Sequence, residues 1–248
     1  MRINSYYRQA WAPAEVDPDI LEKGLGEWLE ANSKACIDRL IQCPSQLDDN
    51  DTATLLRYIE LQRIRVPRQA QSAKELMRNL ILRLAPPEAT AAIRASEVLL
   101  TIRDSARFDY MRMCIGQLDP WFGRMEWEVI EAEKGSAFVT TDSPVSFYNE
   151  KLRPPTEPGL ALAGTIVFFP LTSRHMLLMR HPEYAGDSAV SPLLVVPKPP
   201  DEDVSISIMH GVIWDSSVVT NLNWKLVRLS DRFIVAESRE VLDRCIKG

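Results

Sequence analysis

The stretch Met125-Glu126-Trp127-Glu128-Val129-Ile130 decides the predicted fold, because apolar and charged residues nearly alternate along it. A period of two places alternate side chains on opposite faces of a strand. Glu133-Lys134-Gly135-Ser136 follows as turn material, and Ala137-Phe138-Val139-Thr140 is a second strand candidate. We therefore expect the two strands to pair as a hairpin.

Further strands are expected downstream of this hairpin. Thr165-Ile166-Val167-Phe168-Phe169 is an uninterrupted apolar run, which is typical of a strand inside a sheet. Residues 175–179 and 233–236 have the same character. Three helices are predicted between and after these strands, over residues 203–217 with Asp203 as its cap, over 218–230 and over 238–246.

Before residue 118 the apolar residues recur with helical spacing. The pattern predicts four helices, over residues 17–42, 51–65, 70–84 and 87–117. The fold class is therefore α+β, with an N-terminal helical bundle packed with a mixed or antiparallel sheet that carries C-terminal helices. Residues 1–118 form a helical region and residues 119–248 a strand-rich α+β region. The sequence leaves open whether the two are separate or one integrated domain.

The composition is that of a globular protein, with 46% hydrophobic and 25% charged residues among 248. The net charge of −5 excludes a global basic field that would attract nucleic acid or acidic lipid. The charge is uneven, because residues 57–112 hold eleven Lys and Arg against six Asp and Glu. Residues 119–248 hold thirteen against eighteen.

Targeting signals and a disulfide framework are also missing from the sequence. The first seven residues lack the apolar region of a secretory leader. No apolar run reaches the roughly 18 residues that a membrane-spanning helix needs. Four cysteines are too few for a disulfide scaffold at this length. We expect a soluble cytoplasmic protein that does not associate with membranes.

Two short boxes carry a resemblance to a known family. Residues 138–145 read Phe138-Val139-Thr140-Thr141-Asp142-Ser143-Pro144-Val145, and residues 167–172 read Val167-Phe168-Phe169-Pro170-Leu171-Thr172. They resemble the family called domain of unknown function 4238, whose members show Phe-Ile-Thr-Ser-Asp-Asn-Pro-Val and then a Phe-Pro-Leu-Ser strand end. Residues 61–68 look like the family's helical segment with an Arg-x-Pro ending, and the likeness runs from about residue 17 to residue 240.

The chain departs from the family pattern at its start. Many members open with His-Tyr-Val-Pro, whereas this chain has Asn4-Ser5-Tyr6-Tyr7-Arg8 and no histidine there. If that histidine belongs to a site, this chain lacks it. The resemblance implies an architecture, and it brings no established activity.

Asp142 is the strongest candidate for chemistry, since it follows a predicted strand and lies between Thr141 and Ser143. A carboxylate at a strand end can bind a divalent metal or act as a general base. The alternative is structural, because Asp in Asp-x-Pro can accept a backbone N–H two residues on and form an Asx-turn. A divalent metal is the only cofactor suggested, and no motif requires one.

Other polar residues are candidates for binding a substrate. On a helix Arg65 and Arg68 would share a face, while Arg63 would point elsewhere. That face could hold phosphate or carboxylate, or it could pair with local acids. Asn223 could cap a helix or bind substrate. Together with Thr141 and Ser143, these residues are the predicted substrate-binding set.

Several frequent catalytic motifs are absent from the sequence. The three histidines, His175, His181 and His210, lack zinc-site spacing and an identifiable third ligand. There is no glycine-rich phosphate loop and no Gly-x-Ser-x-Gly elbow. Because these motifs are absent, the common NTPases, Rossmann oxidoreductases and α/β-hydrolases are not among the favoured functional classes.

Two hypotheses of different class follow. In the first, which we favour, the protein is an interaction or regulatory module without catalysis, and Asp142 is hydrogen-bonded in its own turn. In the second it is a metal-dependent hydrolase, nuclease-like or phosphoesterase-like, in which Asp142 meets a second acid or an arginine around a cavity. The sequence leaves the partner open between another protein, a second copy of the chain and nucleic acid.

Overall fold

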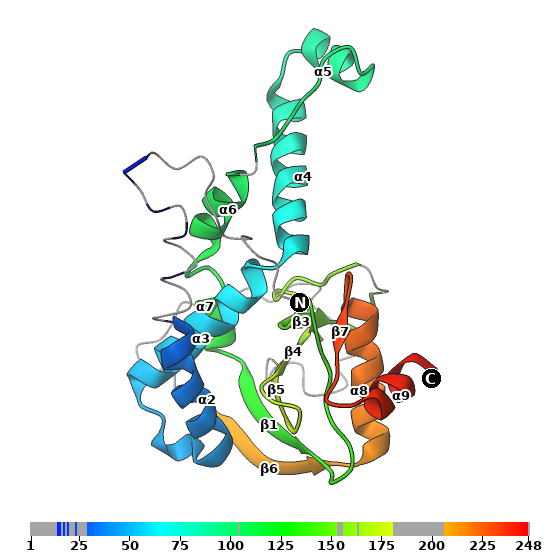
Figure 1. The fold of residues 1–248 in the computed structure, drawn as a ribbon. Helices are drawn as coiled ribbons and strands as arrows, with labels where there is room; N and C mark the ends of the chain where they lie inside the picture. Colours follow the sequence, from blue (N-terminus) through cyan, green and yellow to red (C-terminus); the bar gives the residue numbers. More distant parts are fainter. Residues whose placement is uncertain are drawn as a thin grey trace, which may run out of the picture.

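A computed structural model describes residues 29–103, 105–152, 156–162, 164–180 and 206–247, together with residues 14, 15, 17, 19 and 23. Helices dominate these ranges before residue 123, and a sheet with two further helices follows (Figure 1). The α+β class is therefore confirmed. The helices and strands have the bounds α2 (Ala31–Gln42), η2 (Pro44–Gln46), α3 (Asp49–Ile64), α4 (Pro67–Leu84), α5 (Pro87–Arg94), α6 (Ala106–Cys114), α7 (Asp119–Phe122), β1 (Glu126–Ala132), β2 (Thr140–Thr141), β3 (Ser146–Tyr148), β4 (Ile166–Pro170), β5 (His175–Arg180), β6 (Ile208–Trp214), α8 (Ser216–Leu229), β7 (Ile234–Val235) and α9 (Arg239–Lys247).

The first helices follow their sequence signals. Asp48 caps α3, because its side chain accepts a hydrogen bond from the Asp51 N–H at 2.7 Å. Pro67 occupies the first turn of α4, where a missing N–H costs no helical hydrogen bond. The helices predicted over 51–65 and 70–84 are confirmed. Of the helix predicted over 17–42, residues 31–42 are confirmed, and most of the remainder lies outside the described residues.

The long helix predicted over residues 87–117 is wrong, because two separate helices, α5 and α6, occupy that range. Ser96 has a left-handed backbone with φ of +62°. The N–H groups of Glu97 and Val98 both donate to the Ala92 carbonyl. Bonds of this kind close the end of a helix, so α5 stops and the chain turns back.

The main sheet is mixed, with the strand order β3-β4-β5-β1-β6. Every pair is antiparallel except β1 with β6, which is parallel. Gly211 forms an irregularity there, because Val129 pairs with His210 and Ile130 with Val212. Its φ of +81° suits glycine, which adopts left-handed backbone without a steric penalty.

Two predictions for this sheet are wrong. Residues 126–132 and 137–140 do not form a hairpin, because β5 and β6 take both edges of β1, and β2 pairs instead with β7. The helix predicted over 203–217 is also wrong where it is described, since residues 208–214 are the strand β6. That segment is rich in β-branched and aromatic residues, which favour strands. Asp215 then caps α8.

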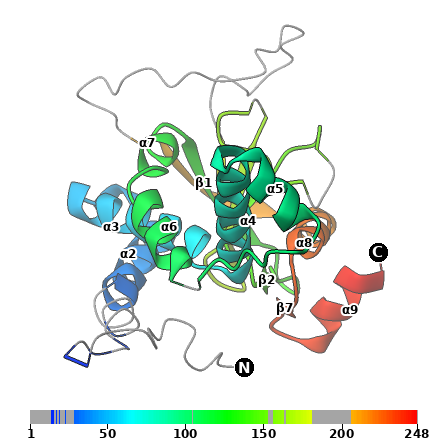
Figure 2. The same cartoon turned by 90° about the horizontal axis from the view of Figure 1, so that it is seen from above.

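The sheet has two buried faces, which we call the helical side and the α8 side. Alternate residues of β5 face the two sides, Leu177 and Met179 on the first and Met176 and Leu178 on the second. The helical-side core includes residues of α2 and α3 such as Leu40 and Leu55. The α8-side core includes Val219, Leu222 and Leu226 of α8. Helices therefore cover both faces, with side chains from before and after residue 118 in one core (Figure 2).

The helix α4 leaves this body and projects away from it, with α5 at its tip (Figure 1). Residues 95–103 then run back along α4 to α6 (Figures 1 and 2). We call α4, α5 and residues 95–103 the arm. The base of the arm packs against the body, with contacts from α4 to α6 and to α3.

Candidate functional site

Asp142 lies in the turn after β2, and its carboxylate binds a distant segment. Oδ1 accepts the Asp231 N–H at 3.0 Å and Oδ2 accepts the Arg232 N–H at 2.6 Å. Both donors belong to the loop between α8 and β7. The predicted Asx-turn is wrong, because residue 144 is a proline and has no N–H to donate.

Thr141 and Ser143 form the local turn instead. The Thr141 Oγ1 accepts the Ser143 N–H at 3.0 Å and donates to the Ser143 carbonyl at 3.1 Å. Both residues are buried. Among the described residues, no group of three His, Cys, Asp or Glu side chains could hold a metal ion. These contacts support the structural interpretation of the aspartate turn.

Arg65 and Arg68 do not share a helical face, because α3 ends at Ile64 and α4 begins at Pro67. Arg65 pairs with Glu30, with Nη1 and Oε1 2.6 Å apart. Arg68 donates from Nη1 to the Leu229 carbonyl at 3.4 Å, at the end of α8. Arg68 and Asp142 therefore bind the end of α8 and the turn that follows it, while Arg65 is engaged elsewhere.

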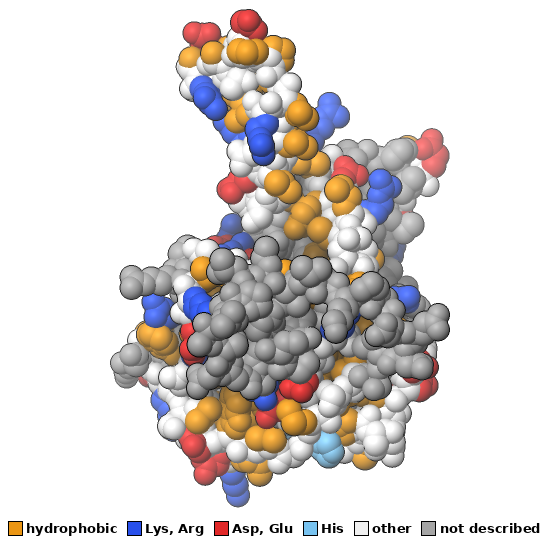
Figure 3. Space-filling view, turned by 180° about the vertical axis from the view of Figure 1, so that it is seen from behind, with side chains coloured by type: hydrophobic (Ala, Val, Ile, Leu, Met, Phe, Trp, Pro, Cys, Tyr) orange, Lys and Arg blue, Asp and Glu red, His pale blue; other side chains and the backbone are white. Residues whose placement is uncertain are grey.

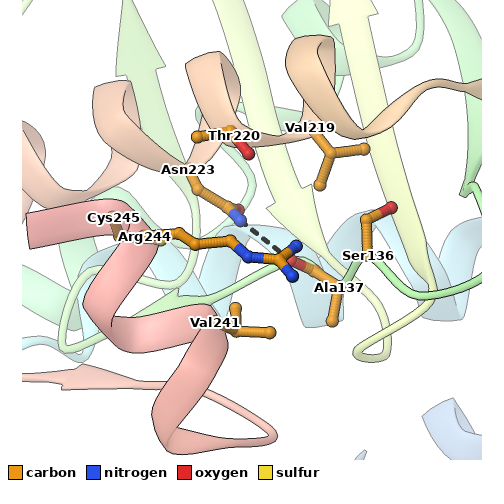
Figure 4. A pocket seen from close by; sticks show the side chains of 8 residues that line it. All are labelled: Ser136, Ala137, Val219, Thr220, Asn223, Val241, Arg244 and Cys245. Carbon is orange, nitrogen blue, oxygen red and sulfur yellow. Dashed lines mark hydrogen bonds between the residues drawn. The ribbon is translucent and has the colours of Figure 1, made fainter. Parts of the chain in front are cut away.

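Asn223 lies inside α8 and is buried, so the predicted role as a cap at a helix start is wrong. Its Oδ1 accepts the Val139 N–H at 3.0 Å, and its Nδ2 donates to the Ala137 carbonyl at 2.8 Å (Figure 4). The amide thus satisfies backbone groups that the predicted hairpin would have paired. The cavity beside it has a volume of about 10 Å³, which is the space of a single water molecule.

Arg63 is the buried arginine of this region, with 6% of its surface exposed. Its Nη2 lies 2.5 Å from the Glu157 Oε2, and its guanidinium carbon lies 4.2 Å from the centre of the Phe147 ring. Gln69 donates to the same Glu157 oxygen at 3.1 Å. These contacts connect Arg63 of α3 and Gln69 of α4 to Glu157, which lies between β3 and β4. The signal in the sequence was that Arg63 lies four residues after the core residue Ile59.

The two described histidines, His175 and His210, lie on different strands, β5 and β6. His175 lies on β5, where its Nδ1 is 3.1 Å from the Thr172 Oγ1, and burial lowers its pKa. His210 is exposed on the strand β6, although a helix was predicted there. His181 lies outside the described residues.

Two carboxylates meet on the helical side near α7, and they differ in their partners. Glu60 is 1% exposed and accepts the N–H groups of Gly116 and Leu118 at 2.6 and 2.8 Å. Asp119 follows Leu118 in the chain, and its Oδ1 atom is buried with no hydrogen-bond partner. Burial and then the charge of Glu60 raise the pKa of Asp119 to about 6, against the opposing effect of Arg57. In the sequence, this position marks only the boundary between the helical region and the strand-rich region.

Asp119 lines a groove of about 540 Å³ between η2, the start of α3, α7 and the start of β6. The walls are apolar with a few polar groups, and the lining consists of Pro44, Ser45, Leu47, Asp49, Thr52, Leu56, Asp119, Pro120, Gly123, Arg124, Ile206 and Ile208. A volume of this size is typical of a small-molecule site. No motif in the sequence indicated that residues 44–56, 119–124 and 206–208 lie together.

The arm carries an uncovered apolar face. Gln69 and Ala73 are buried at the base of α4, and the same helical face continues outward through Leu76, Leu80 and Leu84. These three leucines, which we call the arm stripe, are 62%, 54% and 78% exposed. Figure 3 shows hydrophobic side chains gathered along the arm.

The comparisons with known proteins identify a family. The model of the family described as "Protein of unknown function (DUF4238)" matches residues 2–240. No curated protein and no solved structure gives a significant match. Within the described ranges, no helix combines the length and the apolar character needed to cross a membrane. Because the family match covers nearly the whole chain and includes both boxes around Asp142 and Pro170, the chain belongs to the DUF4238 family.

Proposed function

We propose that this chain is a protein-interaction module, and that the arm stripe binds an acidic amphipathic helix of a partner protein. The observation that carries this proposal is the uncovered continuation of one helical face. Gln69 and Ala73 are buried on that face, whereas Leu76, Leu80 and Leu84 beyond them are more than half exposed.

The arm stripe has the spacing of a helix-binding surface. Leu76, Leu80 and Leu84 are four residues apart, so their side chains form one row along α4. Full burial of a leucine side chain contributes about 1.5–3 kcal/mol. Contiguous exposed apolar side chains of this kind mark interaction sites on soluble proteins.

The charge around the stripe favours an acidic partner. Arg83 is exposed on α4 three residues after Leu80, so it lies beside the stripe, and residues 57–112 carry a balance of +5. Two copies of the arm placed together would bring like charges against each other, which opposes self-association through this face. An acidic helix would pair with Arg83 while its apolar face covers the leucines.

The alternative function, a metal-dependent hydrolase that uses Asp142, stays a prediction. In its favour there is only the position of Asp142 at a strand end. Both carboxylate oxygens accept backbone N–H groups, and Arg65, Arg68 and Asn223 each have other partners in the described residues.

The test is a titration of a labelled synthetic helix followed by fluorescence anisotropy. The peptide carries leucines four residues apart with glutamates on both flanks, and its control carries lysines in place of the glutamates. We expect the glutamate peptide to bind, and Leu80→Ser with Leu84→Ser to weaken it at least about tenfold, as for a lost anchor of roughly 1.4 kcal/mol. Ile246→Ser removes an equally exposed apolar side chain from α9 and should leave binding unchanged.

Three outcomes would overturn the proposal. The lysine peptide could bind as tightly as the glutamate peptide, or the double leucine variant could bind as tightly as the natural chain. A doubled mass in light scattering that Leu80→Ser abolishes would instead assign the stripe to contact between two copies.

A further inference from the structure

We propose that the groove beside α7 binds an organic cation, an ammonium or guanidinium group on an apolar body, with Asp119 as its anionic anchor. This site is separate from the arm stripe, so each proposal stands or fails without the other.

The first argument is the lack of a partner for Asp119. Its Oδ1 is buried without a hydrogen bond, and its Oδ2 accepts none from the described residues. Two carboxylates of α3 do have hydrogen-bond donors. Asp51 accepts from the Arg39 guanidinium, and Glu60 accepts two backbone N–H groups. A buried carboxylate without a donor lowers stability when it is ionised. A cation from outside the chain would supply the positive charge and the hydrogen-bond donor that Asp119 lacks.

The second argument is the electrostatics of the groove. The charged groups on its lining are Asp49 and Asp119 against Arg124, which gives a net negative wall. The further charges that act on Asp119 come from α3, where Glu60 adds negative charge and Arg57 opposes it. An anionic ligand would meet two acids here, so the charge favours a cation.

The third argument is the shape and chemistry of the walls. Leu47, Leu56, Ile206 and Ile208 give the groove apolar surface, and its volume of about 540 Å³ admits a ligand larger than a bare ion. A metal ion is less suited, because no group of three metal-ligating side chains occurs in the described part of the chain. The ligand is therefore an amine or guanidine whose carbon skeleton packs on the aliphatic residues.

The same chemistry can come from a free amine or from a lysine side chain of a peptide, and calorimetry can separate the two. One probe is 4-phenylbutylammonium, with 4-phenylbutanol as its uncharged control. The other is a blocked Leu-Lys-Leu peptide, with blocked Leu-Gln-Leu as its control. We expect at least one cationic probe to bind at neutral pH and its uncharged control to bind at least about tenfold more weakly.

A variant and a pH series assign the binding to Asp119. Asp119→Asn should weaken the cationic probe at least about tenfold while the protein stays folded, because the substitution removes a charge that the fold does not use. Asp109→Asn makes the same chemical change at an exposed position of α6 and should leave binding unchanged. Affinity should fall as the pH is lowered through about 6, since protonation removes the anion.

Each result has a stated reading. Binding of the free amine alone assigns a small-molecule site, and binding of the peptide alone assigns a site for a lysine side chain. Both results support the proposal. The proposal is overturned if neither cationic probe binds, if the uncharged controls bind as tightly, or if Asp119→Asn, shown by circular dichroism to be folded, binds as well as the natural chain.

Discussion

The α8 side and the helical side of the sheet use their polar residues in different ways. On the α8 side, the polar side chains bond to backbone groups. Asn223 joins α8 to the backbone of residues 137 and 139. Asp142 and Arg68 bond to the backbone at the end of α8 and in the loop after it. On the helical side, Asp119 has no hydrogen-bond partner among the described residues, and away from the sheet the leucines of the arm stripe are more than half exposed. The residues that looked most reactive in the sequence therefore make hydrogen bonds within the fold, whereas the proposed binding sites use groups that the described fold leaves unsatisfied or exposed.

The largest effect is expected for Asn223→Ala. The substitution leaves the Val139 N–H and the Ala137 carbonyl buried and unpaired, and we expect the free energy of unfolding to fall by about 3 kcal/mol. Urea denaturation measures this change. Asn221→Ala, on the exposed face of the same helix, should change stability by less than about 0.5 kcal/mol. Equal losses for the two variants would contradict the role of the Asn223 hydrogen bonds in stabilising the α8 side.

A smaller loss is expected for Asp142→Ala. The carboxylate accepts two backbone N–H groups but is partly exposed, so we expect about 1–2 kcal/mol less stability in the same urea experiment. Glu150→Ala is a control at an exposed position nearby. If Asp142 instead serves catalysis, its removal should leave stability unchanged or raise it.

On the helical side the sign is expected to reverse. The folded-state pKa of Asp119 is raised to about 6 from an ordinary 3.8, so the folded protein binds the proton more tightly than the unfolded chain. Stability is therefore lost as the pH rises from below 3.8 through about 6. Asp119→Asn should raise stability at neutral pH by about 1 kcal/mol, after allowance for solvent screening of a half-buried group.

Thermal denaturation checks this sign. A gain of about 1 kcal/mol corresponds to a melting temperature higher by roughly 2–4 °C for a chain of this size. The gain should vanish below pH 3.8, where the carboxyl is protonated in both states. A gain that persists at low pH would show that charge is not its cause.

The smallest effect is expected in the arm stripe. Leu80→Ser should change stability by less than about 0.5 kcal/mol, because its side chain is already 54% exposed. Ala73→Asp lies on the same helical face but is buried, and it should cost more than about 2 kcal/mol. Urea denaturation of both variants tests whether α4 is packed against the body at Ala73 and exposed at Leu80.

Local patterns predicted the local structure well. The alternation in β1 and the apolar runs of β4 and β5 are set by a few neighbouring residues, and all three strands were predicted at their positions. The failures were of another kind. The left-handed Ser96 that ends α5 has no clear signal in its neighbours, and the partners of β1 lie far along the chain, near residues 175–180 and 208–214.

The candidate sites were harder to predict because they depend on such distant pairings. The sequence placed Asp142 correctly at a strand end, but its partners at residues 231–232 could not be read from the turn. The groove around Asp119 joins segments near residues 44–56, 119–124 and 206–208. Only the folded sheet and its helices bring these three segments together.

Hydrogen–deuterium exchange with and without the glutamate-flanked helix tests most directly whether binding belongs to the arm stripe and not to the α8 side. We expect slower exchange in α4 around residues 76–84 when the peptide is present, and unchanged exchange in α8 and around residues 231–232. Slower exchange confined to α8 and the Asp142 turn, with α4 unaffected, would contradict the account.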